Sequence, residues 1–193
     1  MFNKNHDWFI KELSLPKPPF DLIDLARSAS SPYSDYQGYL FPLNDWRGKS
    51  YIAPVIVRKF FDQQFIDWAN ENITTDFSMA GIMTCDGNLA TPSTGAHTDK
   101  TRDLALIYTV IPGGDNTSLA FWKEKGFPTY RDRGIQIGDY NSLELIDEYP
   151  TPIDCWYLVN SHVLHSVEHM SSSRINLQLS FEGDWWPRGD SNS

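Results

Sequence analysis

The chain has 193 residues, a formal net charge of −9 and a sequence pI near 4.9. This length suits one folded domain with a sizeable core, so we expect a single domain over residues 1–193. The excess of acidic residues argues against a nucleic-acid partner, because phosphate-backbone binding depends on clustered Lys and Arg.

Cysteine content and hydropathy indicate the cellular compartment of the protein. Cys85 and Cys155 are far apart and form no CxxC motif, which predicts two buried thiols in a reducing environment. The amino terminus lacks the basic start and apolar core of a signal peptide, and no uninterrupted apolar run could span a bilayer. We therefore expect a cytoplasmic protein that does not use a membrane; its oligomeric state is not predicted.

Residues 1–55 are rich in Pro, Ser, Asp and aromatic side chains, and their hydrophobic periodicity is weak. One stretch, 20–27, fits a short helix. We expect this N-terminal segment to wrap the core rather than form it, and to contribute part of a substrate-facing surface.

A longer helix is predicted at residues 59–73. The apolar residues Phe61, Phe65, Trp68 and Ala69 follow i, i+4, i+7, i+8 spacing, with polar residues between them. Such a helix should support a sheet through one face.

Residues 77–182 change character, to short apolar runs separated by turn residues. This pattern is typical of an all-β sandwich or barrel, so the fold class is mainly β with flanking helices. Strands are predicted at 77–84, 104–111, 118–123, 134–137, 142–146, 154–160 and 174–181; the second of these is apolar enough to be buried on both faces.

The last of these strands alternates strictly. Arg174, Asn176, Gln178 and Ser180 share one face, and apolar residues take the other. Taken alone, this pattern favours a half-exposed strand with a solvated outer face. The alternative is a polar face that lines a cavity.

A candidate metal site begins at His97 and Asp99, since residues i and i+2 of an extended strand point the same way. The triplet is common by chance and supplies two ligands at most. A second histidine would complete a set that leaves open positions on the metal, which suits Fe(II) that must bind co-substrate and oxygen.

Three histidines, His162, His165 and His169, lie close together just before the last strand, and Arg174 follows the second of them by nine residues. In a strand, His162 and His165 would face opposite ways. We expect His162 to be a packed or solvent-bonded side chain and His169 a surface residue.

Together these residues resemble the non-haem Fe(II)- and 2-oxoglutarate-dependent oxygenases, whose core is a double-stranded β-helix, also described as a jelly-roll or cupin-like barrel. The family pattern is His-x-Asp, a long gap, a distal His and then an Arg. His97 and Asp99 match its first part, His165 the distal ligand and Arg174 the last position. The resemblance extends over about residues 79–181.

The resemblance implies an activity. His97, Asp99 and His165 would hold Fe(II), and Arg174 would pair with the far carboxylate of 2-oxoglutarate, for which a planar guanidinium is well shaped. A substrate would be hydroxylated with O2 while 2-oxoglutarate is converted to succinate and CO2. The sequence does not identify that substrate, which could be a small molecule or a peptide.

Two further residues bear on the co-substrate. Members of the family often carry Ser or Thr two positions after the arginine, whereas this chain has Asn176, whose amide can donate the same hydrogen bond. The hydroxyl of Tyr108 could also reach the carboxylate, although a buried core tyrosine is the more frequent outcome. Arg102, close behind Asp99, could recognise an acidic substrate, but a solvated charge is the safer expectation.

Other functions stay open. A cupin-like β-barrel could bind a metal or small ligand without oxygenase activity, and a zinc-type hydrolase could use the same ligands. An interaction module without a metal would require His97, Asp99, His165 and Arg174 to be scattered in space.

Overall fold

A computed structural model describes the chain at residues 9–28, 42–44, 50–52, 56–60, 63–74, 77, 79–85, 93–99, 102–126, 136–137 and 140–181. Within these residues the fold is mainly β, with two larger antiparallel sheets. A 6-stranded sheet has the order β1 (Ile10–Leu13), β11 (Trp156–Asn160), β7 (Leu104–Pro112), β13 (Arg174–Phe181), β5 (Met79–Cys85), β4 (Ile56–Phe60). A 5-stranded sheet has the order β10 (Leu143–Pro150), β8 (Ser118–Glu124), β12 (Leu164–Glu168), β6 (Ala96–His97), β9 (Gln136–Ile137).

The smaller elements complete the described chain. The short strands β2 (Pro42–Asn44) and β3 (Ser50–Ile52) pair with each other, and a 3₁₀ turn at Tyr140–Ser142 leads into β10. The helices are α1 (Leu22–Ser28) and α2 (Gln63–Asn72). No helix of the described ranges is both long and apolar enough to cross a membrane.

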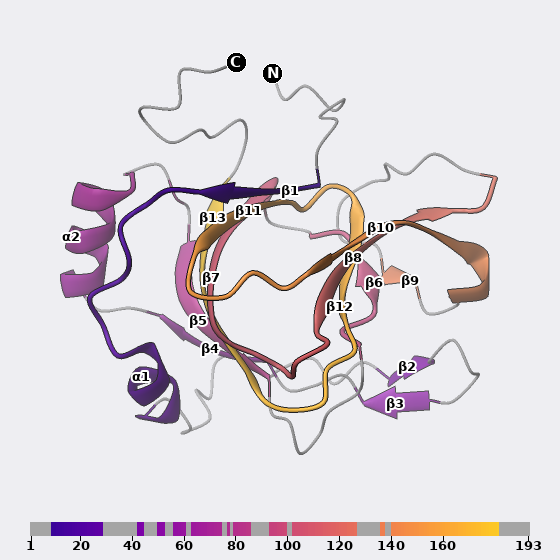
Figure 1. Ribbon diagram of the computed structural model, residues 1–193, viewed down its shortest axis with the longest axis horizontal. Coiled ribbons are helices and arrows are strands. Elements are labelled where there is room, and N and C mark those ends of the chain that lie inside the picture. The colour runs from indigo at the N-terminus through magenta and orange to yellow at the C-terminus, as the bar shows by residue number, and fades with distance from the viewer. Residues whose placement is uncertain are drawn as a thin grey trace.

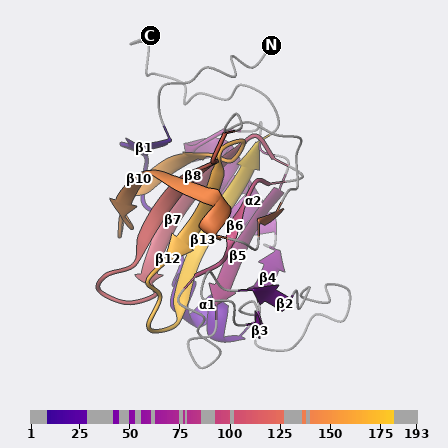
Figure 2. The same cartoon turned by 90° about the vertical axis from the view of Figure 1, so that its right-hand side faces the viewer.

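The two larger sheets face each other, and the helices cover the outer side of the 6-stranded sheet (Figures 1 and 2). One apolar cluster joins the helices to that sheet and includes Phe65 and Leu177. A second cluster, with Ile107, Phe121 and Tyr157, lies between parts of the two sheets. Strands β7 and β11 of the 6-stranded sheet therefore have one face toward the helices and one toward the other sheet.

Strand β13 is buried along its whole length, with β7 on one side and β5 on the other. Its polar residues Arg174, Asn176 and Gln178 are 4%, 4% and 9% exposed. The expectation of a solvated outer face is therefore wrong for this strand. Alternation in the sequence marks which residues share a face, but not that a second sheet covers that face.

The predicted strands correspond to β5, β7, β8, β9, β10, β11 and β13, with boundaries moved by up to a few residues. Strand β7 is buried on both faces over most of its length, as its apolar sequence predicts. The sequence does not predict strands β1, β2, β3, β4, β6 and β12. β12 mixes His, Ser and Glu with apolar residues, so its sequence carries no clear period of two.

The helix predicted at 59–73 begins later, at Gln63, because residues 56–60 form β4 and pair with β5 in the register Lys59↔Ile82. Edge pairing thus overrides the helical periodicity of its first residues. Helix α1 agrees with the prediction for 20–27, and Asp21 caps it by accepting the Asp24 N–H at 2.9 Å.

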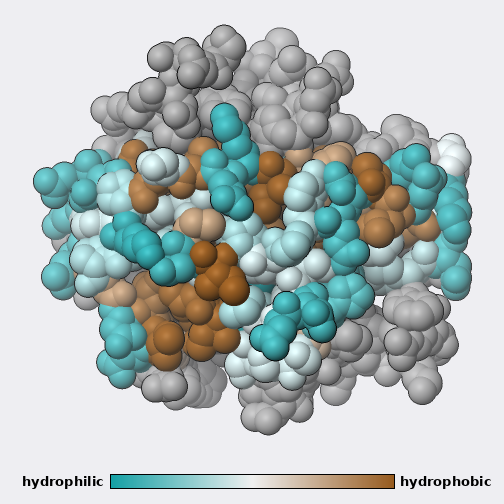
Figure 3. Space-filling view, viewed as in Figure 1, coloured by the Kyte–Doolittle hydropathy of each residue, from teal (hydrophilic) through white to brown (hydrophobic). Residues whose placement is uncertain are grey.

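The N-terminal segment also supplies a strand. Ile10 pairs with Val159, so β1 extends the edge of the 6-stranded sheet instead of only covering it. Residues 1–8, 29–41, 45–49 and 53–55 of the same segment lie outside the described residues. In the space-filling view, hydrophobic side chains gather at the lower left and polar ones cover much of the remaining described surface (Figure 3).

Replacing Leu177 by Ala tests the layered core. Leu177 is 0% exposed between the helices and the sheet, so Leu177→Ala should lower the free energy of unfolding by about 2–5 kcal/mol through lost burial and a residual cavity. Leu145 is 44% exposed, so Leu145→Ala should change the free energy of unfolding by only about 0.5 kcal/mol. Urea unfolding followed by tryptophan fluorescence measures both, and equal effects would contradict the layer assignment.

Candidate metal centre

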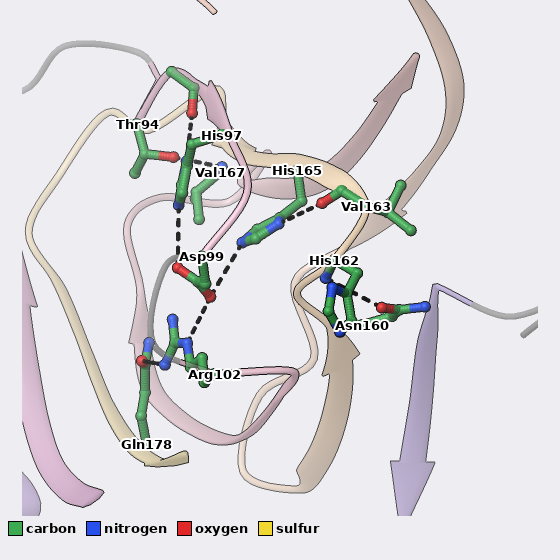
Figure 4. Close-up of polar contacts among 11 residues, drawn as sticks. Thr94, His97, Asp99, Arg102, Asn160, His162, Val163, His165, Val167 and Gln178 are labelled. Atoms are coloured by element: carbon green, nitrogen blue, oxygen red, sulfur yellow. Dashed lines mark hydrogen bonds and ion pairs between the residues drawn. The ribbon is translucent and has the colours of Figure 1, made fainter. Parts of the chain in front are cut away.

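His97 and His165 come from adjacent antiparallel strands of the 5-stranded sheet. β6 pairs with β12 in the register His165↔His97, and the two ring centroids lie 4.6 Å apart. Asp99 follows two residues after His97 and is tied to the segment before β12, because its N–H donates to the Ser161 carbonyl at 3.1 Å. Backbone pairing thus brings three side chains from two distant segments of the chain to one place (Figure 4).

The donor atoms of His97, Asp99 and His165 all lie within 4.8 Å of one another, a group that could hold a metal ion. Nε2 of His97 is 3.8 Å from Oδ1 of Asp99, and Nε2 of His165 is 3.8 Å from Oδ2. Divalent ions bind such ligands at about 2 Å, so small rotations of these side chains suffice to place all three on one ion.

Both imidazoles are held in the orientation that a metal ligand requires. Nδ1 of His97 lies 2.8 Å from the Gly95 carbonyl oxygen, and Nδ1 of His165 lies 2.9 Å from the Val163 carbonyl oxygen. A carbonyl accepts only, so each Nδ1 carries the proton and each Nε2 keeps its lone pair. Such a partner on the second ring nitrogen is typical of metal-binding histidines.

Electrostatics favour the ligating protonation states. Burial raises the pKa of Asp99, but the Arg102 guanidinium, together with the two histidines when they are protonated, outweighs it, and the net pKa lies well below the ordinary value. Burial, with the neighbouring His97, lowers the pKa of His165 from 6.5 to about 4. A carboxylate beside a neutral imidazole at neutral pH is the form that binds metals.

Arg102 is a part of the site that sequence reasoning placed in solvent. Its side chain is 8% exposed, its Nε donates to Oδ2 of Asp99 at 2.5 Å, and its Nη1 donates to Oε1 of Gln178 at 2.5 Å. The only signal in the sequence was an arginine three residues after the candidate carboxylate. Nothing local revealed that the polar face of β13 would cover it.

Arg174 lies on the same face of β13 as Gln178, four residues and roughly 13 Å away along the strand. Its Nη1 donates to the Pro112 carbonyl at 2.7 Å and to Thr151 Oγ1 at 3.4 Å, and its Nη2 to the Tyr157 hydroxyl at 3.3 Å. Within the described residues, no carboxylate pairs with this buried guanidinium.

Asn176 lies between Arg174 and Gln178 on this face and is 4% exposed. Its Oδ1 has no hydrogen-bond partner among the described residues. An unsatisfied amide oxygen at such a depth costs free energy unless a bound group supplies a donor or the amide is turned. Arg174 and Asn176 thus form a polar patch with capacity for a further ligand.

Tyr108 lies elsewhere. It packs in the apolar cluster beneath the helices, and its ring centroid lies 5.2 Å from that of Trp156. Its hydroxyl donates to Asp154 at 2.5 Å. Burial and this hydrogen bond raise its pKa far above the ordinary value. It therefore occupies the opposite face of the sheet from Arg174, and the hydroxyl that reaches Arg174 is that of Tyr157.

The other clustered histidines stay outside the three-ligand group. Nε2 of His162 lies 2.5 Å from a carboxylate oxygen of the buried Asp103, and Figure 4 shows its ring apart from His165. His169 lies at the surface, with Nε2 3.1 Å from a carboxylate oxygen of Glu148. Both placements agree with their expected roles.

Replacing one ligand tests the site. His165→Asn should weaken Co(II) binding by more than the roughly 10–100-fold that loss of an outer-shell partner costs, because a direct ligand is lost. His169→Asn, the same exchange at an exposed position with a left-handed φ of 58°, should leave the affinity unchanged. Competition with a chromophoric chelator measures both, and equal affinities would refute the site.

The buried His165 should also make the metal-free protein sensitive to acid. Its pKa of about 4 lies below the 6.5 of the unfolded chain, so the unfolded state binds more protons in this window and stability falls as pH drops through it. The His165 contribution is at most about 1.4 kcal/mol per pH unit. Urea unfolding at several pH values should show a shallower dependence for His165→Asn; parallel curves would contradict the assignment.

Comparison with known proteins adds no relative to these observations: no protein-family model and no curated protein matches the chain. The interpretation of the His97, Asp99 and His165 group therefore depends on its own geometry and chemistry.

Proposed function

We propose that the protein is an Fe(II)- and 2-oxoglutarate-dependent oxygenase built on a double-stranded β-helix core, which hydroxylates a small-molecule or peptide substrate. One observation carries the proposal. A two-histidine, one-carboxylate group lies on one sheet, and a buried guanidinium without a carboxylate partner among the described residues lies on the inward face of the other. Fe(II) and a dicarboxylate match these two features.

The arrangement of the strands supports this proposal. β6 and β12 carry the two histidines, and β13 carries Arg174, so the metal group and the guanidinium belong to sheets that face each other. Gln178 joins them, because it shares a face of β13 with Arg174 and hydrogen-bonds Arg102, which holds Asp99. A ligand between the sheets could thus reach both the metal group and the guanidinium.

Each part of the site has a distinct role in the proposed reaction. His97, Asp99 and His165 would hold Fe(II), which when bound supplies the redox chemistry and open positions for co-substrate and O2. Arg174 and the Tyr157 hydroxyl would orient the far carboxylate of 2-oxoglutarate.

Apolar side chains beside the metal group would limit access of water. Phe121 is 0% exposed, with its ring centroid 6.5 Å from that of His165, and it stacks on Phe9 of the N-terminal segment at 5.0 Å. Exclusion of water strengthens the electrostatic contacts inside the site and protects reactive species.

Arg174 supplies the sharpest test of the co-substrate. In anaerobic calorimetry on protein loaded with Mn(II), Arg174→Gln should lower 2-oxoglutarate affinity by about 10–100-fold, equivalent to roughly 1.5–3 kcal/mol for a charged hydrogen-bonded pair. Tyr108→Phe should bind 2-oxoglutarate normally, since Tyr108 lies on the opposite face of the sheet.

Turnover supplies the second arm of this test. With Fe(II), 2-oxoglutarate, air and a panel of candidate substrates, the protein should form succinate, and His97→Ala should not. Succinate no higher than in the His97→Ala control would reject the oxygenase. Tight binding of zinc with no measurable 2-oxoglutarate affinity would favour the alternative, a cupin-like metal- or ligand-binding barrel without oxygenase activity.

A further inference from the structure

Each carboxylate oxygen of Asp99 lies at the same distance from one of the two histidines, yet within the described residues only Oδ2 also has an arginine partner. Oδ1 lies 3.8 Å from His97 Nε2, and Oδ2 lies 3.8 Å from His165 Nε2. Arg102 Nε donates to Oδ2 at 2.5 Å. A charge-assisted hydrogen bond of this length uses one lone pair of that oxygen and makes it a weaker ligand for a metal.

Arg102 is itself held in place. Its Nη1 donates to Oε1 of Gln178 at 2.5 Å, and both side chains are buried, at 8% and 9% exposure. Gln178 is neutral, so it does not balance the positive charge of Arg102. In the described part of the chain, Asp99 is the one carboxylate that pairs with Arg102. Figure 4 shows the three side chains in a row, Asp99, Arg102, Gln178, leading away from the histidines.

We infer that Arg102 is a positioning residue that keeps Oδ2 of Asp99 out of the metal's coordination sphere, so that the carboxylate ligates through Oδ1 alone. This inference deepens the proposed function, because it concerns the same metal site. Coordination through one oxygen leaves a position on the metal for co-substrate. The nearby guanidinium also makes the site more positive, which favours an anionic ligand there.

The inference predicts that removal of Arg102 strengthens metal binding. In Arg102→Gln, Oδ2 becomes available as an additional ligand and a positive charge beside the ion disappears. Co(II) should then bind more tightly, by about tenfold or more, since both changes favour the cation. If Arg102 only supported the fold around Asp99, the same substitution would weaken Co(II) binding.

The test uses Co(II) alone, because its visible absorption reports coordination number and requires no turnover. Arg102→Gln should show weaker visible bands than the wild type, as expected for a higher coordination number. Arg102→Lys keeps the charge without the fork of donors and should be intermediate. Gln178→Leu frees one end of the guanidinium and should shift the spectrum in the same direction by less.

Lys17→Gln is the control, because it removes an exposed cation that pairs with Asp154, the partner of Tyr108 on the opposite face of the sheet. Its Co(II) affinity and spectrum should equal those of the wild type. Weaker Co(II) binding or an unchanged spectrum in Arg102→Gln would overturn the inference. Were that variant unable to fold, an unchanged spectrum in folded Gln178→Leu would do the same.

The outcomes for Arg102 and for the oxygenase are separable. Wild-type protein that binds Co(II) but not 2-oxoglutarate would reject the proposed function, while the Co(II) spectra of the Arg102 variants would still decide the role of Arg102. Normal 2-oxoglutarate binding with weaker Co(II) binding in Arg102→Gln would reject only the inference. A wild type that binds no Co(II) would overturn both.

Discussion

The antiparallel pairing of β6 with β12 is the constraint on which the site depends. β6 spans Ala96–His97 alone, and the register His165↔His97 sets the two imidazoles side by side. A slip of one residue would turn His165 to the other face of the sheet. The Ser161 carbonyl, which accepts the Asp99 N–H, adds the third ligand to the same framework. Backbone hydrogen bonds, rather than contacts among the ligands, therefore define the group.

Two buried guanidinium groups lie near the metal group, although the chain as a whole is acidic. The formal net charge is −9, yet two buried guanidinium groups, Arg102 and Arg174, share only the carboxylate of Asp99 among the ion pairs of the described residues. The buried Asp103 is paired with His162. Burying unbalanced charge is costly unless a ligand compensates it. An anionic group bound by Arg174 would compensate the charge of that guanidinium, as the proposed co-substrate would.

The double burial of β13 links the core to this chemistry. Its apolar residues pack beneath α1 and α2, where they bury area that stabilises the fold, while its polar residues face the second sheet. Arg174 and Gln178 are thereby placed on an element held by neighbours on both sides, β7 and β5. Side chains on rigid strands keep their geometry better than those on loops, which an orienting role requires.

Local sequence determined much of this protein: the β character after residue 77, the period of α2, the shared face of His97 and Asp99, and the alternation of β13, since each depends on the spacing of neighbours along the chain. The pairing between distant segments could not be predicted from the sequence. It placed residues 59 and 60 of the predicted helix in strand β4, added β1 and β12, and put Tyr108 beneath the helices. Burial of Arg102 and the covering of the polar face of β13 were likewise decided by the tertiary structure, because alternation says which side chains share a face and only sheet packing says what that face meets.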